Sequence, residues 1–342
     1  MTTHLVTGGA GFLGSLTARA LHARGDRVRI LDLLDAPELP SGIERVQGDV
    51  ADPRCVGEAM AGVDIVHHHA ALVPLTKSDA GFMRVNVEGT RIAVEAARQA
   101  AVKFFVHVST SAVYGVPARC PIDDQTPLAP IDPYGEAKLA GERHVQRAMA
   151  AGFPCAIVRP RTVIGRERLG IFEILFEWIL EGRRIYVLGD GRQRMQLLHV
   201  DDAIACMVDL AEQARPGVYL LGTDRFATLG EDLTALIRHA GTASRVVGIP
   251  APPAIAALRV LDWLGVSPLA PWHYLTYHKD FFFDLSRATS TGWRPRYSNA
   301  EALIDAFDWY RAHGRAPQDS AARSTHRKSV RQGALGLLRR FS

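Results

Sequence analysis

The stretch Thr7-Gly8-Gly9-Ala10-Gly11-Phe12-Leu13-Gly14 follows a short apolar run, His4–Thr7, and opens a helical pattern that continues to Arg24. Gly8 allows a tight turn, Gly11 lets the backbone approach a pyrophosphate, and Gly14 permits close packing of helix on strand. Glycine spacing alone also occurs in ordinary turns, so the strand before it and the helix after it carry the inference. The stretch predicts a dinucleotide-binding α/β fold.

Asp32 ends the second apolar run, where a carboxylate accepts hydrogen bonds from the adenosine ribose hydroxyls and repels a 2′-phosphate. The predicted cofactor is therefore NAD rather than NADP. The expected cofactor contacts, besides Tyr134 and Lys138 described below, are Gly8, Gly11, Phe12, Leu13, Gly14, Asp32, Asp49, Val50 and Ala70. Asp49 and Val50 fit a plain turn at a strand end equally well.

Strand-like and helix-like segments alternate along the first half of the chain. The predicted strands are His4–Thr7, Arg27–Asp32, Glu44–Gly48, Asp64–His68, Phe104–Ser109 and Cys155–Arg159; the helix-like stretches are Phe12–Arg24, Val56–Met60, Phe82–Ala100 and Tyr134–Ala151. This alternation indicates right-handed crossovers and a doubly wound, Rossmann-type parallel sheet with helices on both faces.

The alternation of strand-like and helix-like segments ends after Arg159, which predicts a smaller substrate-binding lobe. We expect an NAD-binding domain over residues 1–165, a lobe formed by residues 166–195 and 225–314, and a flexible tail over residues 315–342. Gln196–Val200, the helix-like Asp202–Gln213 and Val218–Leu221 indicate that the chain returns to the sheet over about residues 196–224.

Composition is that of a globular protein, with 47% apolar and 22% charged residues among 342. The net charge of +4 arises in the tail, where seven Lys/Arg face Asp319 alone, so the body carries −2. A body without a basic face argues against nucleic-acid binding. The four cysteines lack metal or disulfide spacing, and three successive strand histidines, 67 to 69, cannot converge on one ion, so we expect no metal and a cytoplasmic protein.

Tyr134 and Lys138 stand four residues apart at the start of a predicted helix, so their side chains share one face. A phenol has a pKa of about 10, but a nearby ammonium and a positively charged nicotinamide can stabilise the phenolate. Such a pair can remove a hydroxyl proton as a hydride leaves. Ser109, Thr110 and Ser111 end the fifth strand and can bind the same hydroxyl.

These residues carry a family resemblance. The motifs are Gly8-x-x-Gly11-x-x-Gly14, His68-His69-Ala70-Ala71, Asn86-Val87-Glu88-Gly89-Thr90, Ser109-Thr110-Ser111-Ala112-Val113-Tyr114-Gly115, Tyr134-Gly135-Glu136-Ala137-Lys138 and His199-Val200-Asp201-Asp202. Together they resemble the extended short-chain dehydrogenases/reductases, which include NAD-dependent sugar-nucleotide epimerases and dehydratases and 3β-hydroxysteroid dehydrogenase-like enzymes. The resemblance implies that Thr110, Tyr134 and Lys138 are catalytic. It also implies a homodimer.

The substrate class is predicted from a few positions. Sugar-nucleotide dehydratases of this family carry acidic residues after the catalytic Thr, whereas this chain has Ser111 and Ala112, so elimination is disfavoured. Arg194 stands where epimerases place an Arg on the substrate diphosphate, although a solvated loop charge explains it equally well. With Ser111 and Thr162 as further substrate contacts, the leading prediction is epimerisation of a nucleoside-diphosphate sugar.

Two alternatives remain at the sequence level. Pro250–Tyr277 is similar to the apolar insert of 3β-hydroxysteroid dehydrogenase-like proteins, which favours a dehydrogenase or reductase of an apolar alcohol or keto-sugar; a buried helix is the simpler interpretation. A non-catalytic NAD-binding protein is the other alternative. In the tail, Val330, Ala334, Leu337, Leu338 and Phe341 would share one helix face, compatible with weak contact with a membrane surface.

Overall fold

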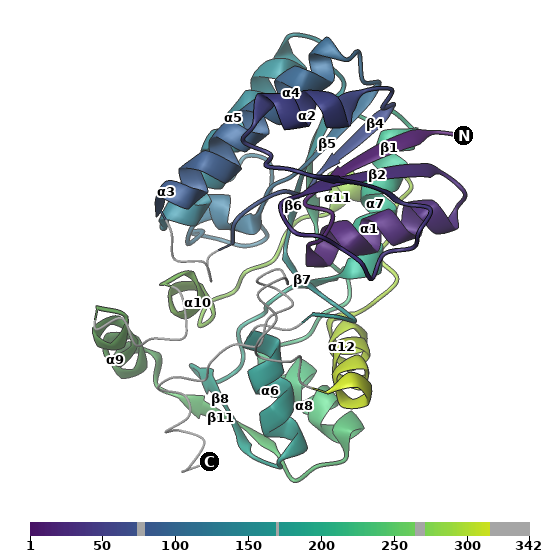
Figure 1. Cartoon of the computed structure of the whole chain (residues 1–342). Helices are drawn as coiled ribbons and strands as arrows, with labels where there is room; N and C mark the ends of the chain where they lie inside the picture. Colours follow the sequence, from purple (N-terminus) through teal and green to yellow (C-terminus); the bar gives the residue numbers. More distant parts are fainter. Residues whose placement is uncertain (74–78, 169–170, 264–270, 315–342) are drawn as a thin grey trace.

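The computed structural model describes residues 1–73, 79–168, 171–263 and 271–314 (Figure 1). Its main sheet has the order β10-β6-β5-β4-β1-β2-β3. These strands are β1 (Thr3–Thr7), β2 (Arg27–Asp32), β3 (Glu44–Gln47), β4 (Ile65–His68), β5 (Phe104–Val108), β6 (Cys155–Pro160) and β10 (Gly217–Leu221). All six pairings are parallel, so the predicted doubly wound fold is confirmed. The strand order reverses between β1 and β4, where such sheets bind ligands.

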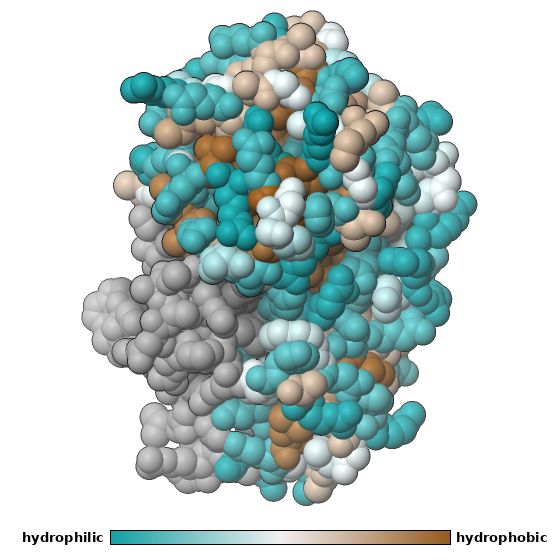
Figure 2. Space-filling view, turned by 45° about the vertical axis from the view of Figure 1, so that its right-hand side comes forward, coloured by the Kyte–Doolittle hydropathy of each residue, from teal (hydrophilic) through white to brown (hydrophobic). Residues whose placement is uncertain are grey.

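Helices cover both faces of this sheet. They are α1 (Phe12–Ala23), α2 (Pro53–Met60), α3 (Asp79–Phe82), α4 (Thr90–Gln99), α5 (Pro133–Ala150), α7 (Val200–Glu212) and α11 (Ser286–Thr289). Side chains alternate along each strand, so Leu5 joins the core beneath α2, α4 and α5 while Val6 joins the core beneath α1 and α7. Hydrophilic residues cover most of the face in Figure 2, with hydrophobic residues in small groups between them.

The predicted helix Phe82–Ala100 is built from three pieces. A π-helical segment, Met83–Gly89, joins α3 to α4. Asn86 lies in this segment and exchanges two hydrogen bonds with the backbone of Leu72, accepting at 2.8 Å and donating at 3.0 Å. These bonds attach the chain that follows β4 to the π-helical segment.

The return of the chain to the sheet is only partly as predicted. Val218–Leu221 lies in β10, which pairs with β6. The prediction for Gln196–Val200 is wrong in its partner, because β9 (Leu197–His199) pairs with β7 (Thr162–Ile164) in a separate two-stranded sheet. Leu197 and Leu198 are buried, as their apolar character predicts. An apolar run does not indicate which strand it will pair with.

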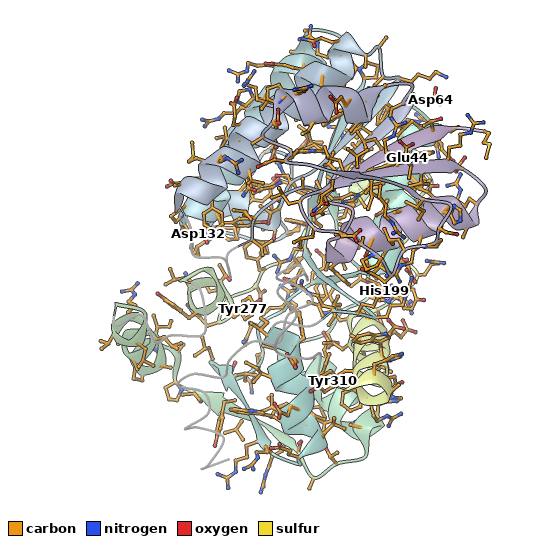
Figure 3. The ribbon with its side chains drawn as sticks, in the orientation of Figure 1. Glu44, Asp64, Asp132, His199, Tyr277 and Tyr310 are labelled. Atoms are coloured by element: carbon orange, nitrogen blue, oxygen red, sulfur yellow. The ribbon has the colours of Figure 1, made fainter. Side chains whose placement is uncertain are left out.

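A second part of the molecule lies below the sheet in Figure 1. It contains the parallel pair β8 (Arg184–Leu188) and β11 (Arg245–Ile249) with α6 (Ile171–Leu180), α8 (Leu229–Ala240) and α12 (Asn299–His313). One apolar cluster joins these helices, with Phe176 and Phe307 fully buried in it. His199, seen near α12 in Figure 3, lies 3.1 Å from the Asp305 carboxylate and links this part to α7.

The apolar stretch after Pro250 forms α9 (Ala251–Trp263) and α10 (Pro271–Thr276). The expectation of a buried helix is wrong for α9: none of residues 251–261 is buried, and Val260 is 57% exposed. Helical spacing of apolar residues predicts a helix, but burial depends on a packing partner. No helix in the described ranges is both long and apolar enough to cross a membrane. The tail and its predicted helix face lie outside those ranges.

Candidate active site

The first turn of α5 positions the predicted catalytic pair. Asp132 begins the helix by accepting a 2.7 Å hydrogen bond from the Gly135 amide, and Pro133 occupies the first helical position. Both features favour a helix start at this point. Tyr134 and Lys138 therefore lie one turn apart on the same face, and Figure 3 shows Asp132 at this end of the helix.

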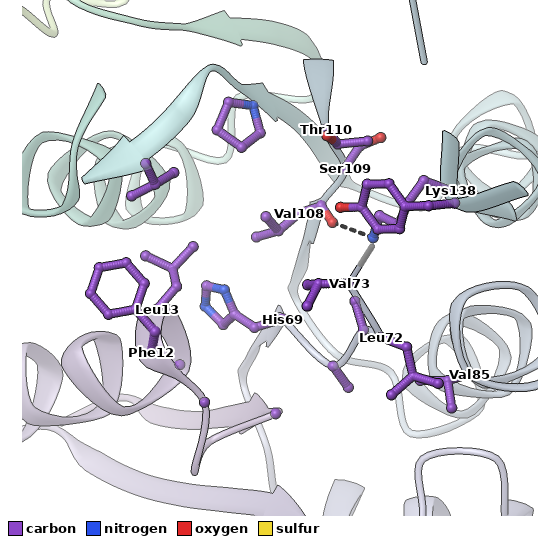
Figure 4. Close-up of a pocket in the computed structure, with 18 of the residues that line it drawn as sticks. Phe12, Leu13, His69, Leu72, Val73, Val85, Val108, Ser109, Thr110 and Lys138 are labelled. Carbon is purple, nitrogen blue, oxygen red and sulfur yellow. Dashed lines mark hydrogen bonds between the residues drawn. The ribbon is translucent and has the colours of Figure 1, made fainter. Parts of the chain in front are cut away.

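Lys138 is buried, with 2% of its surface exposed. Its ammonium donates a 2.6 Å hydrogen bond to the carbonyl oxygen of Val108, at the end of β5 (Figure 4). Burial lowers the pKa of Lys138 to about 8, and the charge of Glu142 opposes the shift. This hydrogen bond places the lysine at the carboxyl end of β5, close to Thr110.

Tyr134 is half-buried, and its ring packs edge-on against Phe82 at 5.9 Å. Burial raises the pKa of Tyr134 to about 12, against the smaller lowering effects of the Thr110 hydroxyl and the Arg168 charge. Among the described residues, neighbouring groups therefore do not bring this phenol into the physiological range. The sequence-based expectation is that a positively charged nicotinamide ring supplies the further cation that stabilises the phenolate.

The glycine-rich loop has the close contacts that a phosphate cradle needs. Gly8 has φ +70°, and a Cβ there would lie 2.7 Å from the Ala70 nitrogen. A Cβ on Gly14 would lie 2.1 Å from the Gly8 carbonyl oxygen. Gly11 begins α1 without a side chain to cap it, so the amides of the first turn suit an anionic acceptor.

Asp32 braces the loop from the end of β2. Its carboxylate accepts hydrogen bonds from the backbone amides of Ala10 at 3.0 Å and Leu34 at 2.9 Å. Burial raises the pKa of Asp32, and these two hydrogen bonds oppose the shift. Each carboxylate oxygen keeps a lone pair for a ribose hydroxyl.

A cavity of about 530 Å³ unites most of the predicted site. Its wall includes the predicted residues Gly8, Gly11, Phe12, Leu13, Gly14, Asp32, Asp49, Val50, Ala70, Thr110, Ser111, Tyr134, Lys138 and Thr162. Ser109 also reaches the wall, but its hydroxyl donates a 2.7 Å hydrogen bond to Glu142. Of the three hydroxyls that follow β5, those of Thr110 and Ser111 remain for a ligand.

Arg194 lies apart from the residues that form the cavity wall. Its guanidinium is 2.7 Å from the Asp280 carboxylate and rests over the Phe282 ring at 4.4 Å. The side chain is half exposed. Contact with a substrate diphosphate, as expected from the sequence, would compete with this ion pair.

Sequence reasoning missed His69 as a ligand contact. Its imidazole lines the cavity between Leu13 and Val73 (Figure 4), and both ring nitrogens are buried without a hydrogen-bond partner in the described chain. Burial, together with the charge of Lys138, lowers the pKa of His69 to about 3, so the ring is neutral and offers one donor and one acceptor. Orphaned polar atoms beside a glycine cradle fit a dinucleotide.

Three further residues of the wall were also missed: Arg161, Arg168 and Tyr277. Arg161 directly follows β6, so its place at the carboxyl end of a central strand was a usable signal. Tyr277 comes from the chain after α10, as Figure 3 shows, and no local pattern marks it. The cavity is thus formed by both parts of the molecule.

Comparison with known proteins identifies the family. The sequence pattern of the NAD dependent epimerase/dehydratase family matches residues 4–222. The chain belongs to this family. Its glycine cradle, its acidic residue at the end of β2 and its Tyr134/Lys138 pair fit NAD, the cofactor of the family.

Relatives within the family differ in their reactions. The chain is 39% identical over 338 residues to the uncharacterized protein y4nG of Sinorhizobium fredii, covering 98% of this chain and 85% of that protein. It is 34% identical over 275 residues to a 4-hydroxy-2-methyl-3-oxo-4-farnesyl-3,4-dihydroquinoline-1-oxide ketoreductase of Stigmatella aurantiaca, covering 78% and 82%. Among solved structures, the NAD complex of Thermus thermophilus UDP-glucose 4-epimerase matches with a TM-score of 0.74 and 26% identity, covering 91% of this chain and 100% of that one.

Proposed function

We propose that this protein is an epimerase of a nucleoside-diphosphate sugar that works by transient oxidation of a substrate hydroxyl. The observation that carries the proposal is that Tyr134, Lys138 and Thr110 line one cavity together with the glycine loop. Figure 4 shows Thr110 and Lys138 across this cavity from Phe12 and Leu13. When bound, NAD supplies a ring that accepts a hydride and returns it. The Thermus epimerase, with the same fold, supports the choice of reaction.

Three residues of the cavity would have separate roles in this reaction. Tyr134 would accept the proton of the sugar hydroxyl and later return it, because its phenol lies in the cavity. The Thr110 hydroxyl, whose hydrogen bond lowers the pKa of Tyr134, would also bind the oxygen of the sugar hydroxyl. Lys138 would add positive charge close to the phenol and bind the ribose. Epimerisation requires that the keto sugar turn before the hydride is returned to its other face and Tyr134 returns the proton.

The residues after Thr110 argue against elimination of water. Ser111 accepts a 3.0 Å hydrogen bond from Arg161, and Ala112 carries no polar atom. Elimination needs an additional acid and base next to the reacting carbon. In the described part of the cavity wall the carboxylates are Asp32, which ends β2, and Asp49, which follows β3, both at the cofactor end. Redox chemistry without dehydration is the reaction that this wall supports.

A reductase or dehydrogenase of an apolar or keto substrate is the second candidate. The Stigmatella ketoreductase, at 34% identity, favours it. So does the Arg194–Asp280 ion pair, which engages the arginine that a diphosphate would need. In this reaction NADH would be formed or consumed in proportion to product.

One assay separates the candidates. Purified protein with NAD would be offered UDP-glucose, UDP-glucuronate and dTDP-glucose, and then 3-hydroxy acids, while sugars are followed by NMR and NADH by absorbance. Sugar interconversion without net NADH supports the epimerase, and NADH formed in proportion to an oxidised hydroxy acid supports the dehydrogenase. A dehydrated keto-deoxysugar would refute the argument from Ser111 and Ala112. Tyr134→Phe protein serves as the control for contaminating activity.

A further inference from the structure

Arg161 is a buried cation without an anionic partner in the described chain. Only 3% of the residue is exposed. Its Nε donates to the carbonyl oxygen of Gln196 at 3.2 Å and its Nη1 to the Ser111 hydroxyl at 3.0 Å, both neutral acceptors. The guanidinium also stacks on the Phe281 ring at 4.0 Å. Burial lowers the pKa of Arg161 to about 10.

Arg159, two residues earlier, shows how this protein compensates a buried arginine. It is 5% exposed, and its guanidinium is paired with the carboxylate of Glu142. A charge in a protein interior is costly unless it is paired. The contrast between Arg159 and Arg161 within one stretch of chain indicates that the partner of Arg161 comes from outside the described residues.

Arg168 lines the same cavity and is a second cation without an anionic partner among the described residues. Its Nε is buried without a hydrogen-bond partner in the described ranges, and its guanidinium lies 5.4 Å from the centre of the Phe12 ring. Tyr277 is close enough to both arginines to influence their pKa values, so both cations lie at the Tyr277 end of the cavity. No carboxylate belongs to this end of the described wall, because Asp32 ends β2 and Asp49 follows β3, at the cofactor end.

We propose that Arg161 and Arg168 bind a carboxylate carried by the substrate close to its reacting carbon, so that the substrate is an acid, such as a uronic acid sugar or a hydroxy or oxo acid. Guanidinium groups bind carboxylates through paired N–H donors. The proposal rests on the proposed function in one respect, which is that Tyr134 marks the reacting carbon.

The position of Arg161 distinguishes this anion from the cofactor's pyrophosphate. The pyrophosphate cradle is the loop from Gly8 to Gly14, which follows β1. Arg161 instead donates a hydrogen bond to Ser111, the residue after Thr110. The Thr110 hydroxyl in turn lowers the pKa of Tyr134 through a hydrogen bond. The cation therefore lies at the reacting end of the cavity, where the substrate must be.

Matched ligand pairs test the proposal by binding, independently of turnover. Full-length, NAD-loaded protein in a Tyr134→Phe background would be titrated calorimetrically with UDP-glucuronate against UDP-glucose, and with 3-hydroxyoctanoate against its methyl ester. A charge-assisted hydrogen bond is worth enough for about tenfold tighter binding of the acid in at least one pair. The pair that shows the preference identifies whether the acid is a sugar nucleotide or a simple hydroxy acid.

Removal of each cation completes the test. In Arg168→Gln and Arg161→Gln proteins the preference for the acid should fall about tenfold, while affinity for the neutral member stays the same. Arg192→Gln is the matched control, since Arg192 is a surface arginine outside the cavity wall with an 87% exposed side chain. If Arg161→Gln does not fold, Arg168→Gln alone decides the outcome.

Three results would overturn the proposal: equal affinity for acid and neutral member in both pairs, an acid preference that survives Arg168→Gln, or an equal loss of UDP-glucose and UDP-glucuronate affinity in that variant. The last result would assign the arginines to the diphosphate. Absence of turnover on every substrate, with the acid preference intact, would refute the proposed reaction and leave this inference standing.

Discussion

The ammonium of Lys138 donates a 2.6 Å hydrogen bond to the carbonyl oxygen of Val108. This bond joins α5 to the carboxyl end of β5, and it satisfies a buried cation with a neutral acceptor. Burial lowers the pKa of Lys138 to about 8, so its proton is held less tightly than in the unfolded chain.

A consequence for stability follows from this pKa. Between pH 8 and 10.5 the unfolded lysine keeps a proton that the folded one has lost, so the Lys138 contribution to the free energy of unfolding rises with pH. Across this window, the free energy of unfolding of wild type should rise relative to that of Lys138→Met by at most about 1.4 kcal/mol per pH unit. Urea unfolding of both proteins at several pH values measures the difference. A difference independent of pH would contradict the lowered pKa of the buried ammonium.

Replacement of Tyr134 by Phe removes the phenol that we propose exchanges the substrate proton. Turnover should fall by about 10² to 10⁴ or more, because a positioned acid/base contributes that much. NAD binding should be retained, since the ring still packs against Phe82. Steady-state rates and calorimetric NAD titration would be compared with Tyr186→Phe in β8, which should behave as wild type. An active Tyr134→Phe protein would rule out the proposed chemistry.

Replacement of His69 by Leu should separate stability from cofactor binding. The two orphaned nitrogens of His69 destabilise the folded chain on their own, so the variant should be as stable as wild type or more stable. If one nitrogen bonds to NAD, affinity for NAD should fall about three- to tenfold. His107→Leu is the matched control, because His107 is buried with both nitrogens orphaned and lies outside the cavity wall. Equal NAD affinity in both variants would remove His69 from the cofactor site.

The glycine loop predicts a sharp contrast between two helical glycines. Ala at position 14 would place its Cβ 2.1 Å from the Gly8 carbonyl oxygen, so Gly14→Ala should destabilise the protein by about 1–3 kcal/mol and abolish NAD binding. Gly57 in α2 has no atom within 4 Å of such a Cβ, so Gly57→Ala should stabilise by up to about 1 kcal/mol. Thermal unfolding with and without NAD measures both, and a tolerated Gly14→Ala would mean that the loop packs more loosely.

Local patterns were sufficient to predict the strands of the main sheet, the glycine loop and the helix that carries Tyr134 and Lys138. Strand alternation, turn chemistry and the four-residue spacing of Tyr134 and Lys138 depend on neighbours within a few residues. These features therefore determine the Rossmann-type sheet and place Asp32, Thr110 and Tyr134 at one sheet edge.

Other features depended on contacts between distant segments, and only the tertiary structure decided them. The β7 strand, rather than the main sheet, pairs with β9, and α9 packs too little to be buried. Arg194 meets Asp280, 86 residues away, and Arg161 meets Ser111, 50 residues away. A local pattern carries no information about which partner a charge will find, because ion pairing and burial are set by the packing of elements that are remote in the chain.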